Sequence, residues 1–304
     1  MPAGVINTGS HPRALWPGIH TFWGQVYDEY APEYPDLFEQ EDSDRAYELD
    51  VQITGFGLAP VKPQGDGIAF DSEIQGPESR YTPIAYALGY IVTYEELKFN
   101  LYEQVSMRRA KGNAFSMQQT LENVAAFLYN NAFVTTYFTT GDGVALVSTA
   151  HVNTTGGTYS NELSPSADLS EAALEDMSIQ VMGTETDRGL LISLMIESLH
   201  IPRQEWFNAN RILKSVLQSD TGNNNINVLK ATNAIPKGIK LNHYFSNSSY
   251  WFVRTNCPNG MRMFWAEQPN FSQDNDWDTK NAKAGSYMLF SVGATDPRGI
   301  FGSQ

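Results

Sequence analysis

The histidines are the residues best suited to metal binding or proton transfer, and their spacing favours neither. They are His11, His20, His151, His200 and His243. None has a second histidine or a cysteine at the short spacing that metal ligands share. An isolated histidine after an apolar run, such as His200, is typical of a side chain accommodated in the core. We therefore expect no metal site among the histidines.

Other reactive side chains also lack the partners that catalysis needs. Cys257 is the single cysteine, in the turn-like sequence NCPNG, so no internal disulfide can form. Glu95 and Glu96 are adjacent on an expected helix and point in different directions, which makes a poor acid–base pair. No phosphate-binding loop, dinucleotide fingerprint or G-x-S-x-G motif occurs. The sequence predicts no catalytic residue, no cofactor and no enzyme.

One acidic stretch resembles the start of a calcium-binding loop. It is DNDWD, residues 274–278. Thr279 replaces the glycine of position 6, however, and Gly285 replaces the glutamate of position 12. We interpret this stretch as the polar tip of a hairpin and predict no metal there.

Charge and hydropathy narrow the class of protein. The chain has 304 residues and a net charge of −14. Affinity for phosphate depends on Lys and Arg, so this negative charge argues against a protein that binds nucleic acid tightly. It is compatible with a protein that lies beside nucleic acid without binding it. No run approaches the roughly 18–20 apolar residues of a membrane span, and the first residues lack the features of a secretory signal. We expect no membrane partner.

The stretch from Tyr94 to about Thr136 predicts a long helix around which the rest is organised. It contains no proline, and Met117, Leu121 and Val124 recur at helical spacing. Forty residues would make a rod of roughly 60 Å. Gly112 and Asn113 are its weak point, because glycine costs about 1 kcal/mol against alanine inside a helix. We expect one kinked rod; the alternative is two helices joined there.

The residues before this helix predict two extended segments. Residues 1–46 are rich in proline and aromatic residues and predict an arm with a short amphipathic helix at 19–26, followed by an acidic turn at 39–44. Residues 47–93 predict a two-stranded ribbon whose strands, near 47–60 and 80–94, flank a long loop. Such a ribbon buries little by itself, so we expect it to pack on a neighbour.

The residues after the long helix mix helices with strands. We expect helices at 169–182 and 205–217, the first capped by Asp168 or Ser170. Strands are expected at 144–147, at 189–201, and in several runs from 226 onward that begin with INVLKATNAI. The order is that of an α+β fold and not of alternating βαβ units.

Four segments together resemble the major capsid proteins of tailed bacteriophages, within them the Mu-like head subunits. They are QQTLENVAAFLYNNAF; LVSTAHVNTTGGTYSN with SADLSEAALEDM; LHIPRQEWFNANRILKS; and the terminal run from FWAEQPNF to GIFGS. Their order covers most of residues 94–304, whereas the arm and ribbon match in architecture only. The resemblance implies an α+β fold of the type first seen in phage HK97. Its parts would be an N-terminal arm (1–46), an extended loop or β-ribbon (47–93), a peripheral domain with the spine helix (94–188) and its C-terminal strands (263–304), and an axial domain (189–262).

The resemblance also implies a function, which is self-assembly into hexamers and pentamers of an icosahedral shell around packaged double-stranded DNA. Implied partners are other copies of the chain, a portal, scaffolding or decoration proteins, and DNA held without sequence specificity. The location would be the virion capsid, assembled in the host cytoplasm. Candidate intersubunit contacts are the charged residues of the ribbon and long helix: Arg80, Glu95, Glu96, Arg108, Arg109 and Lys111.

Two other classes stay open on the sequence. A tail tube or ring component would share the lack of chemistry but would form tubes or rings instead of closed shells. An intracellular hydrolase that uses carboxylates would need a concave site with a perturbed carboxyl pKa. Neither shell size nor covalent cross-linking is predicted by the sequence.

Overall fold

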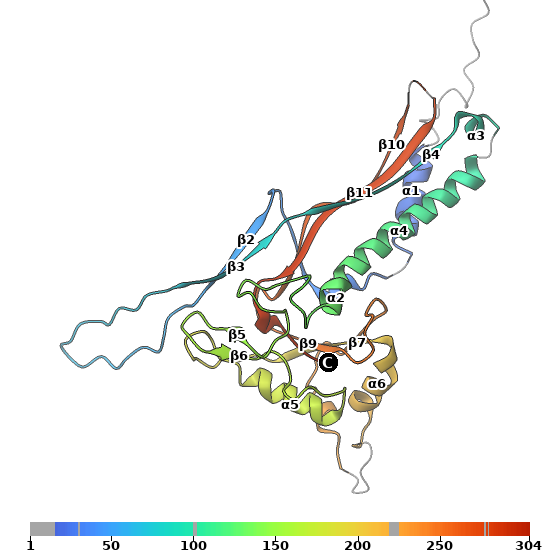
Figure 1. The fold of residues 1–304 in the computed structure, drawn as a ribbon. Helices are drawn as coiled ribbons and strands as arrows, with labels where there is room; N and C mark the ends of the chain where they lie inside the picture. Colours follow the sequence, from blue (N-terminus) through green and yellow to red (C-terminus); the bar gives the residue numbers. More distant parts are fainter. Residues whose placement is uncertain (1–15, 30, 100–101, 219–224, 277, 279) are drawn as a thin grey trace, which may run out of the picture.

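The structure is a computed structural model that describes residues 16–29, 31–99, 102–218, 225–276, 278 and 280–304. Residues 1–15 of the predicted arm lie outside the described residues. Figure 1 shows a long branch of strands beside one helix, a thin hairpin that projects from its base, and a smaller unit below. The helices are α1 (Trp16–Tyr27), α2 (Tyr34–Leu37), α3 (Tyr94–Lys98), α4 (Tyr102–Asn130), α5 (Glu171–Met182), α6 (Trp206–Lys214) and α7 (Val228–Ala231), with 3-10 turns η3 (Arg203–Glu205) and η4 (Pro297–Gly299).

The strands form two four-stranded sheets and two hairpins. The first sheet has the order β1-β10-β11-β4, and the second has the order β12-β9-β7-β8. The two-stranded pairs are β2 with β3 and β5 with β6. Their bounds are β1 (Glu39–Asp42), β2 (Glu48–Ile53), β3 (Gln75–Tyr81), β4 (Ile84–Val92), β5 (His151–Val152), β6 (Thr158–Tyr159), β7 (Ile196–Pro202), β8 (Ile239–Asn242), β9 (Trp251–Thr255), β10 (Met261–Asn275), β11 (Ala282–Ala294) and β12 (Ile300–Ser303).

The long helix is shorter than predicted and is interrupted at a different place. α3 ends at Lys98, α4 begins at Tyr102 and ends at Asn130, so a single rod over 94–136 is wrong. A break at Gly112 is also wrong, because α4 runs through this residue. A Cβ added to Gly112 would meet nothing within 4 Å, so the glycine lies on the open face of the helix.

The buried face of α4 organises the first core. Ala110, Ala114, Met117 and Leu121 are fully buried at helical spacing and pack with the strands β10 and β11. The small alanines let the sheet approach the helix closely. Asn113, also buried, accepts a hydrogen bond from Trp23 Nε1 at 2.9 Å and donates to the Leu88 carbonyl at 2.8 Å. This one side chain therefore joins the helix to both α1 and β4.

The predicted arm is partly confirmed. The amphipathic helix expected at 19–26 lies within α1, whose Trp23 and Val26 are buried in the first core. The expected acidic turn at 39–44 instead contains a strand, since β1 pairs in parallel with β10. All four side chains of β1 are polar and exposed, so backbone pairing with β10, and not burial of side chains, makes this segment a strand.

The ribbon pairs its strands differently from the prediction. β2 pairs with β3, whose residues 75–79 (QGPES) were expected to be loop. The apolar strand β4, expected to be the second strand of the ribbon, pairs instead with β11 in the first sheet. Residues 54–74 connect β2 and β3 without a described helix or strand, and we call them the loop tip.

A second core lies between the second sheet, α5 and α6. Ser170 caps α5 by accepting a hydrogen bond from the Ala173 N–H, as one of the two expected caps. The prediction grouped α5 with the spine helix, but α5 packs in this second core. The prediction also grouped β12 with the other C-terminal strands, but β12 pairs with β9 of the second sheet. Residues 144–147 form a buried segment and not a strand, and INVLKATNAI contains the helix α7.

None of the described helices is both long and apolar enough to cross a lipid bilayer.

Candidate assembly surfaces

The loop tip exposes apolar side chains that a monomer has no means of covering. Phe70 is 95% exposed, Val61 93% and Leu58 83%. Phe56, Ile68 and Ile74 are also exposed. Figure 1 shows the hairpin extending well away from both cores. Large contiguous apolar exposure of this kind marks a surface that meets another molecule.

The long branch also exposes apolar side chains. β4 exposes Ile84, Leu88 and Ile91, and the open face of α4 exposes Phe115 and Phe127. Ile84 pairs with Phe290, which packs in the first core, so Ile84 and Leu88 lie on the core side of the sheet and Ile91 lies on the other side. The chain therefore carries one projecting apolar segment and further apolar side chains exposed on the long branch.

The six charged candidates lie in different settings. Glu96 and Arg109 bind each other through two hydrogen bonds of 3.0 Å, and Lys111 forms an ion pair of 3.3 Å with Glu29, which follows α1. The guanidinium of Arg80 lies 4.3 Å from the ring centre of Tyr47 across the base of the hairpin. Glu95 and Arg108 are exposed, and neither forms an ion pair with another side chain that the structure describes.

Sequence reasoning missed two buried arginines that hold the hairpin and the two cores together. Arg262 of β10 forms ion pairs with Asp50 of β2 and Glu41 of β1. Asp50 also accepts a hydrogen bond from Thr295 Oγ1 at 2.9 Å, and Gln52 Nε2 donates to the Thr295 carbonyl at 2.8 Å. The base of the hairpin is thus fastened to the end of β11 by polar contacts. No local sequence signal marks them, because the partners lie far apart in the chain.

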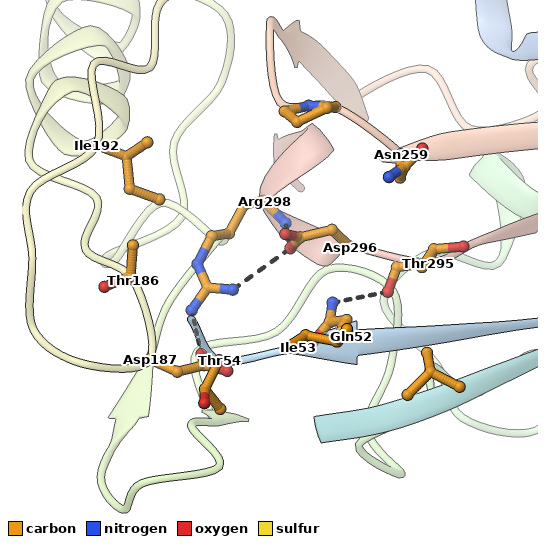
Figure 2. A pocket seen from close by; sticks show the side chains of 12 residues that line it. Gln52, Ile53, Thr54, Thr186, Asp187, Ile192, Asn259, Thr295, Asp296 and Arg298 are labelled. Carbon is orange, nitrogen blue, oxygen red and sulfur yellow. Dashed lines mark hydrogen bonds and ion pairs between the residues drawn. The ribbon is translucent and has the colours of Figure 1, made fainter. Parts of the chain in front are cut away.

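The second of these arginines, Arg298, is at the hollow shown in Figure 2, which has a volume of about 390 Å³. Its guanidinium pairs with Asp187 at 2.6 Å and Asp296 at 3.5 Å, and Nε donates to the Glu185 carbonyl at 3.1 Å. Burial opposes the charge of Arg298, but Tyr159, Asp296 and Asp187 outweigh it and raise its pKa. Arg298 joins the two carboxylates of this hollow, so we interpret the hollow as a structural junction.

A buried aspartate–histidine pair is the nearest approach to catalytic geometry. His151 Nδ1 lies 2.7 Å from Asp142 Oδ2. Burial raises the pKa of Asp142, but the hydrogen bonds from His151 and Thr140 outweigh it and lower the pKa to about 2. His151 is fully buried and stacks on Tyr159, so no substrate can reach its ring. The pair stabilises the segment after α4.

His200 and Cys257 are also enclosed. Burial lowers the pKa of His200 to about 3, and burial raises the pKa of the Cys257 thiol above its usual range. Cys257 therefore holds its proton and is a poor nucleophile. Within the described residues, no group of three or more His, Cys, Asp or Glu side chains could hold a metal ion. Of the DNDWD stretch, Asp274 and Asn275 end β10, and Asp276 and Asp278 lie between β10 and β11, as expected of a hairpin tip, whereas Trp277 lies outside the described residues.

The comparison with protein families identifies the class of protein. A family model described as "Phage capsid protein" matches residues 77–302, which is most of the chain. The chain belongs to this family. A comparison with curated proteins gives no match.

Solved structures agree on the fold, which is that of HK97-like capsid subunits. The chain is similar to a virus-like particle from Pyrococcus furiosus, with a TM-score of 0.56 and 10% identity over 95% of this chain and 98% of that one. It is also similar to the capsid of Myoviridae phage XM1, with a TM-score of 0.52 and 12% identity over 91% and 92% of the two chains. A third similar structure, from Mycobacterium phage Che8, has a TM-score of 0.51 and 9% identity over 90% and 92%. With family and fold together, the protein is a major capsid protein of the tailed-phage type.

Proposed function

We propose that the protein builds an icosahedral shell as hexamers and pentamers in which each extended loop lies across exposed apolar residues of a neighbour's α4 and β4. The observation that carries this proposal is the exposure of the loop tip, where Leu58, Val61 and Phe70 contact almost nothing in the monomer. Burying an exposed Leu or Phe side chain contributes roughly 1.5–3 kcal/mol. Several such side chains on each loop would stabilise a shell in which every subunit places its loop on one neighbour and receives the loop of another.

The candidate charges would act at the rim of this contact. Glu95 and Arg108 are exposed beside the apolar surface of the long branch, so they are available to a neighbour. Glu96, Arg109 and Lys111 already have partners within the subunit, so they would hold the receiving surface in shape. Arg80 would fix the direction of the hairpin through Tyr47. Charges at a rim contribute mainly to specificity and rate of association.

The remaining parts of the proposal follow from shell assembly. The subunit would consist of an arm, an extended loop, a peripheral domain on α4 and the first sheet, and an axial domain on the second core, and α5 and β12 would belong to the axial domain instead of the peripheral domain predicted for them. The shell would form in the host cytoplasm with a portal and with scaffolding or decoration proteins, and would enclose double-stranded DNA. We propose no catalytic role for the subunit, because His151, His200 and Cys257 are enclosed and the exposed His243 pairs with Glu33.

The test is to replace residues 54–74 by a short Gly-Ser linker and to compare assembly with the unchanged chain. Electron microscopy should show particles for the unchanged chain and only unassembled subunits for the variant. Thermal unfolding of the unassembled subunit should change only slightly, because the exposed apolar residues of the loop tip contact neither core and the loss includes only polar contacts such as those of Asp71 and Ser72 with Arg188. Particles of ordinary size from the variant would refute the role proposed for the loop.

A further inference from the structure

Charge is divided unevenly within the unit built on the second core. Residues 162–187 contain seven acidic and no basic side chains. Residues 203–240 contain six basic and two acidic side chains, a net charge of +4 in a chain whose total is −14. The first segment includes α5 and the second includes α6, and Figure 1 shows these helices on separate flanks of the unit.

The outward side of α5 is acidic with apolar residues, and we call it the acidic face. Its members recur at helical spacing and are all exposed: Glu175, Asp176, Ile179 and Met182. Ile179 is 65% exposed. Neither Glu175 nor Asp176 forms an ion pair with a side chain that the structure describes, so the charge of this face is unbalanced within the subunit.

The outward side of η3 and α6 is basic around an aromatic residue, and we call it the basic face. Its members are also exposed at helical spacing: Arg203, Phe207, Arg211 and Lys214. Phe207 is 77% exposed although it lies in the middle of a helix whose other side, at Ala209 and Ile212, is buried. No ion pair engages Arg203 or Arg211 among the described side chains. An exposed aromatic between two arginines is typical of the centre of a protein interface.

We propose that the basic face of one subunit docks on the acidic face of the next copy, head to tail, around a closed ring. The two faces carry opposite charges, and both contain exposed apolar side chains. They lie on different flanks, so the two faces of one subunit cannot pair with each other. A contact between two different faces of identical chains closes into a ring when its rotation allows. The inference rests on the proposed shell, and it assigns the pair of faces that forms the inner contact of each hexamer and pentamer.

Charge reversal on one face tests the pairing. Glu175→Arg with Asp176→Lys, or Arg211→Glu with Lys214→Glu, would place like charges opposite each other and lower the assembled fraction at least about tenfold. All four substitutions in one chain should restore assembly, because the faces are then exchanged. Arg211→Lys with Lys214→Arg keeps the charges and serves as the matched control, which should assemble as the unchanged chain does.

Mixing the two reversed variants provides a sharper measurement. One variant then has two basic faces and the other has two acidic faces. Opposite charges meet at every contact only when the two variants alternate around the ring. Alternation closes a ring of six but not a ring of five. Native mass spectrometry and electron microscopy of the mixture should therefore show hexamers and open sheets or tubes, without closed shells.

These outcomes separate the inference from the proposed function. If the unchanged chain forms shells and each reversed variant also forms them at normal yield, the pairing of the faces is refuted while the capsid function stands. If the four-substitution chain fails to assemble while circular dichroism shows it folded, the pairing is also refuted. Failure of the unchanged chain to form any shell with its partner proteins would refute the proposed function itself.

Discussion

Arg109 of α4 binds Glu96 of α3 through two hydrogen bonds of 3.0 Å, each from a different guanidinium nitrogen to a different carboxylate oxygen. Thirteen residues of continuous helix would separate the two Cα atoms by about 20 Å, beyond the reach of the two side chains. The pair therefore requires the chain to turn between α3 and α4. Arg109 also donates to the Ile91 carbonyl, so it fixes the end of β4 at the same point.

We expect Glu96→Gln to lower the free energy of unfolding by up to about 1 kcal/mol, because both partners are partly exposed. The hydrogen bond from Arg109 lowers the pKa of Glu96. A lowered pKa means that the stabilisation is present above the ordinary glutamate pKa and is lost as the pH falls through the lower value. The difference between variant and unchanged chain should shrink in acid. Urea unfolding of unassembled subunits measures it, with Glu95→Gln as a control expected to change little.

The contribution of Glu122 to stability should depend on pH in the opposite way to that of Glu96. This buried carboxyl of α4 accepts the Glu33 N–H at 2.7 Å, and it faces Tyr27 of α1, Tyr34 of α2, Tyr244 and the charge of Glu33. Burial and the charge of Glu33 raise its pKa to about 7. A raised pKa means that the stabilisation is present in acid and is lost as the pH rises through 7.

We therefore expect Glu122→Gln, which keeps the acceptor for Glu33, to be more stable than the unchanged chain by about 2–3 kcal/mol at pH 9. The difference should fall below about 1 kcal/mol near pH 5. Urea unfolding at both values of pH measures it. Parallel stability curves for the two chains would show that Glu122 is not the group that titrates.

Arg298→Met should destabilise the subunit strongly. The substitution leaves Asp187, which is 9% exposed, without its ion pair, and removes the hydrogen bonds to Glu185 and Asn153. Removing one partner of a buried ion pair costs about 3–5 kcal/mol. Thermal unfolding checks this, and Arg45→Met, which breaks an exposed pair with Glu48, is the matched control with an expected change of less than about 1 kcal/mol. Equal effects of the two substitutions would contradict the role of Arg298.

Two glycines should respond in opposite directions to alanine. A Cβ on Gly299 would lie 2.5 Å from the Cα of Gly260, so Gly299→Ala forces two backbone segments apart and should cost more than about 2 kcal/mol. Gly112→Ala meets nothing within 4 Å on an open helix face and should stabilise the subunit by about 0.5–1 kcal/mol. Melting temperatures of the two unassembled variants should shift to opposite sides of that of the unchanged chain.

Local sequence patterns were sufficient to predict the helices that bury one face. The spacing of Met117 and Leu121 predicted the core side of α4, and Ser170 was one of two expected caps of α5. Both features depend on residues within a few positions of each other. The α+β fold class followed from the order of such elements.

Features that depend on distant partners were missed. β3 contains Gly76 and Pro77 and no apolar alternation, so only its pairing with β2 makes it a strand. The turn between α3 and α4 depends on Glu96 meeting Arg109, a tertiary contact. Of the six candidate contacts, the sequence could not separate those satisfied within the subunit from Glu95 and Arg108, because exposure is a property of the folded chain.

The central claim is that this chain closes into a shell. Electron microscopy with mass measurement by light scattering, on the chain expressed alone and with its neighbouring genes, tests the claim most directly. Closed particles of uniform diameter, tens of nanometres or more across, are the expected result. Tubes or stacked rings would instead favour a tail component. A subunit that remains monomeric under both conditions would contradict the account.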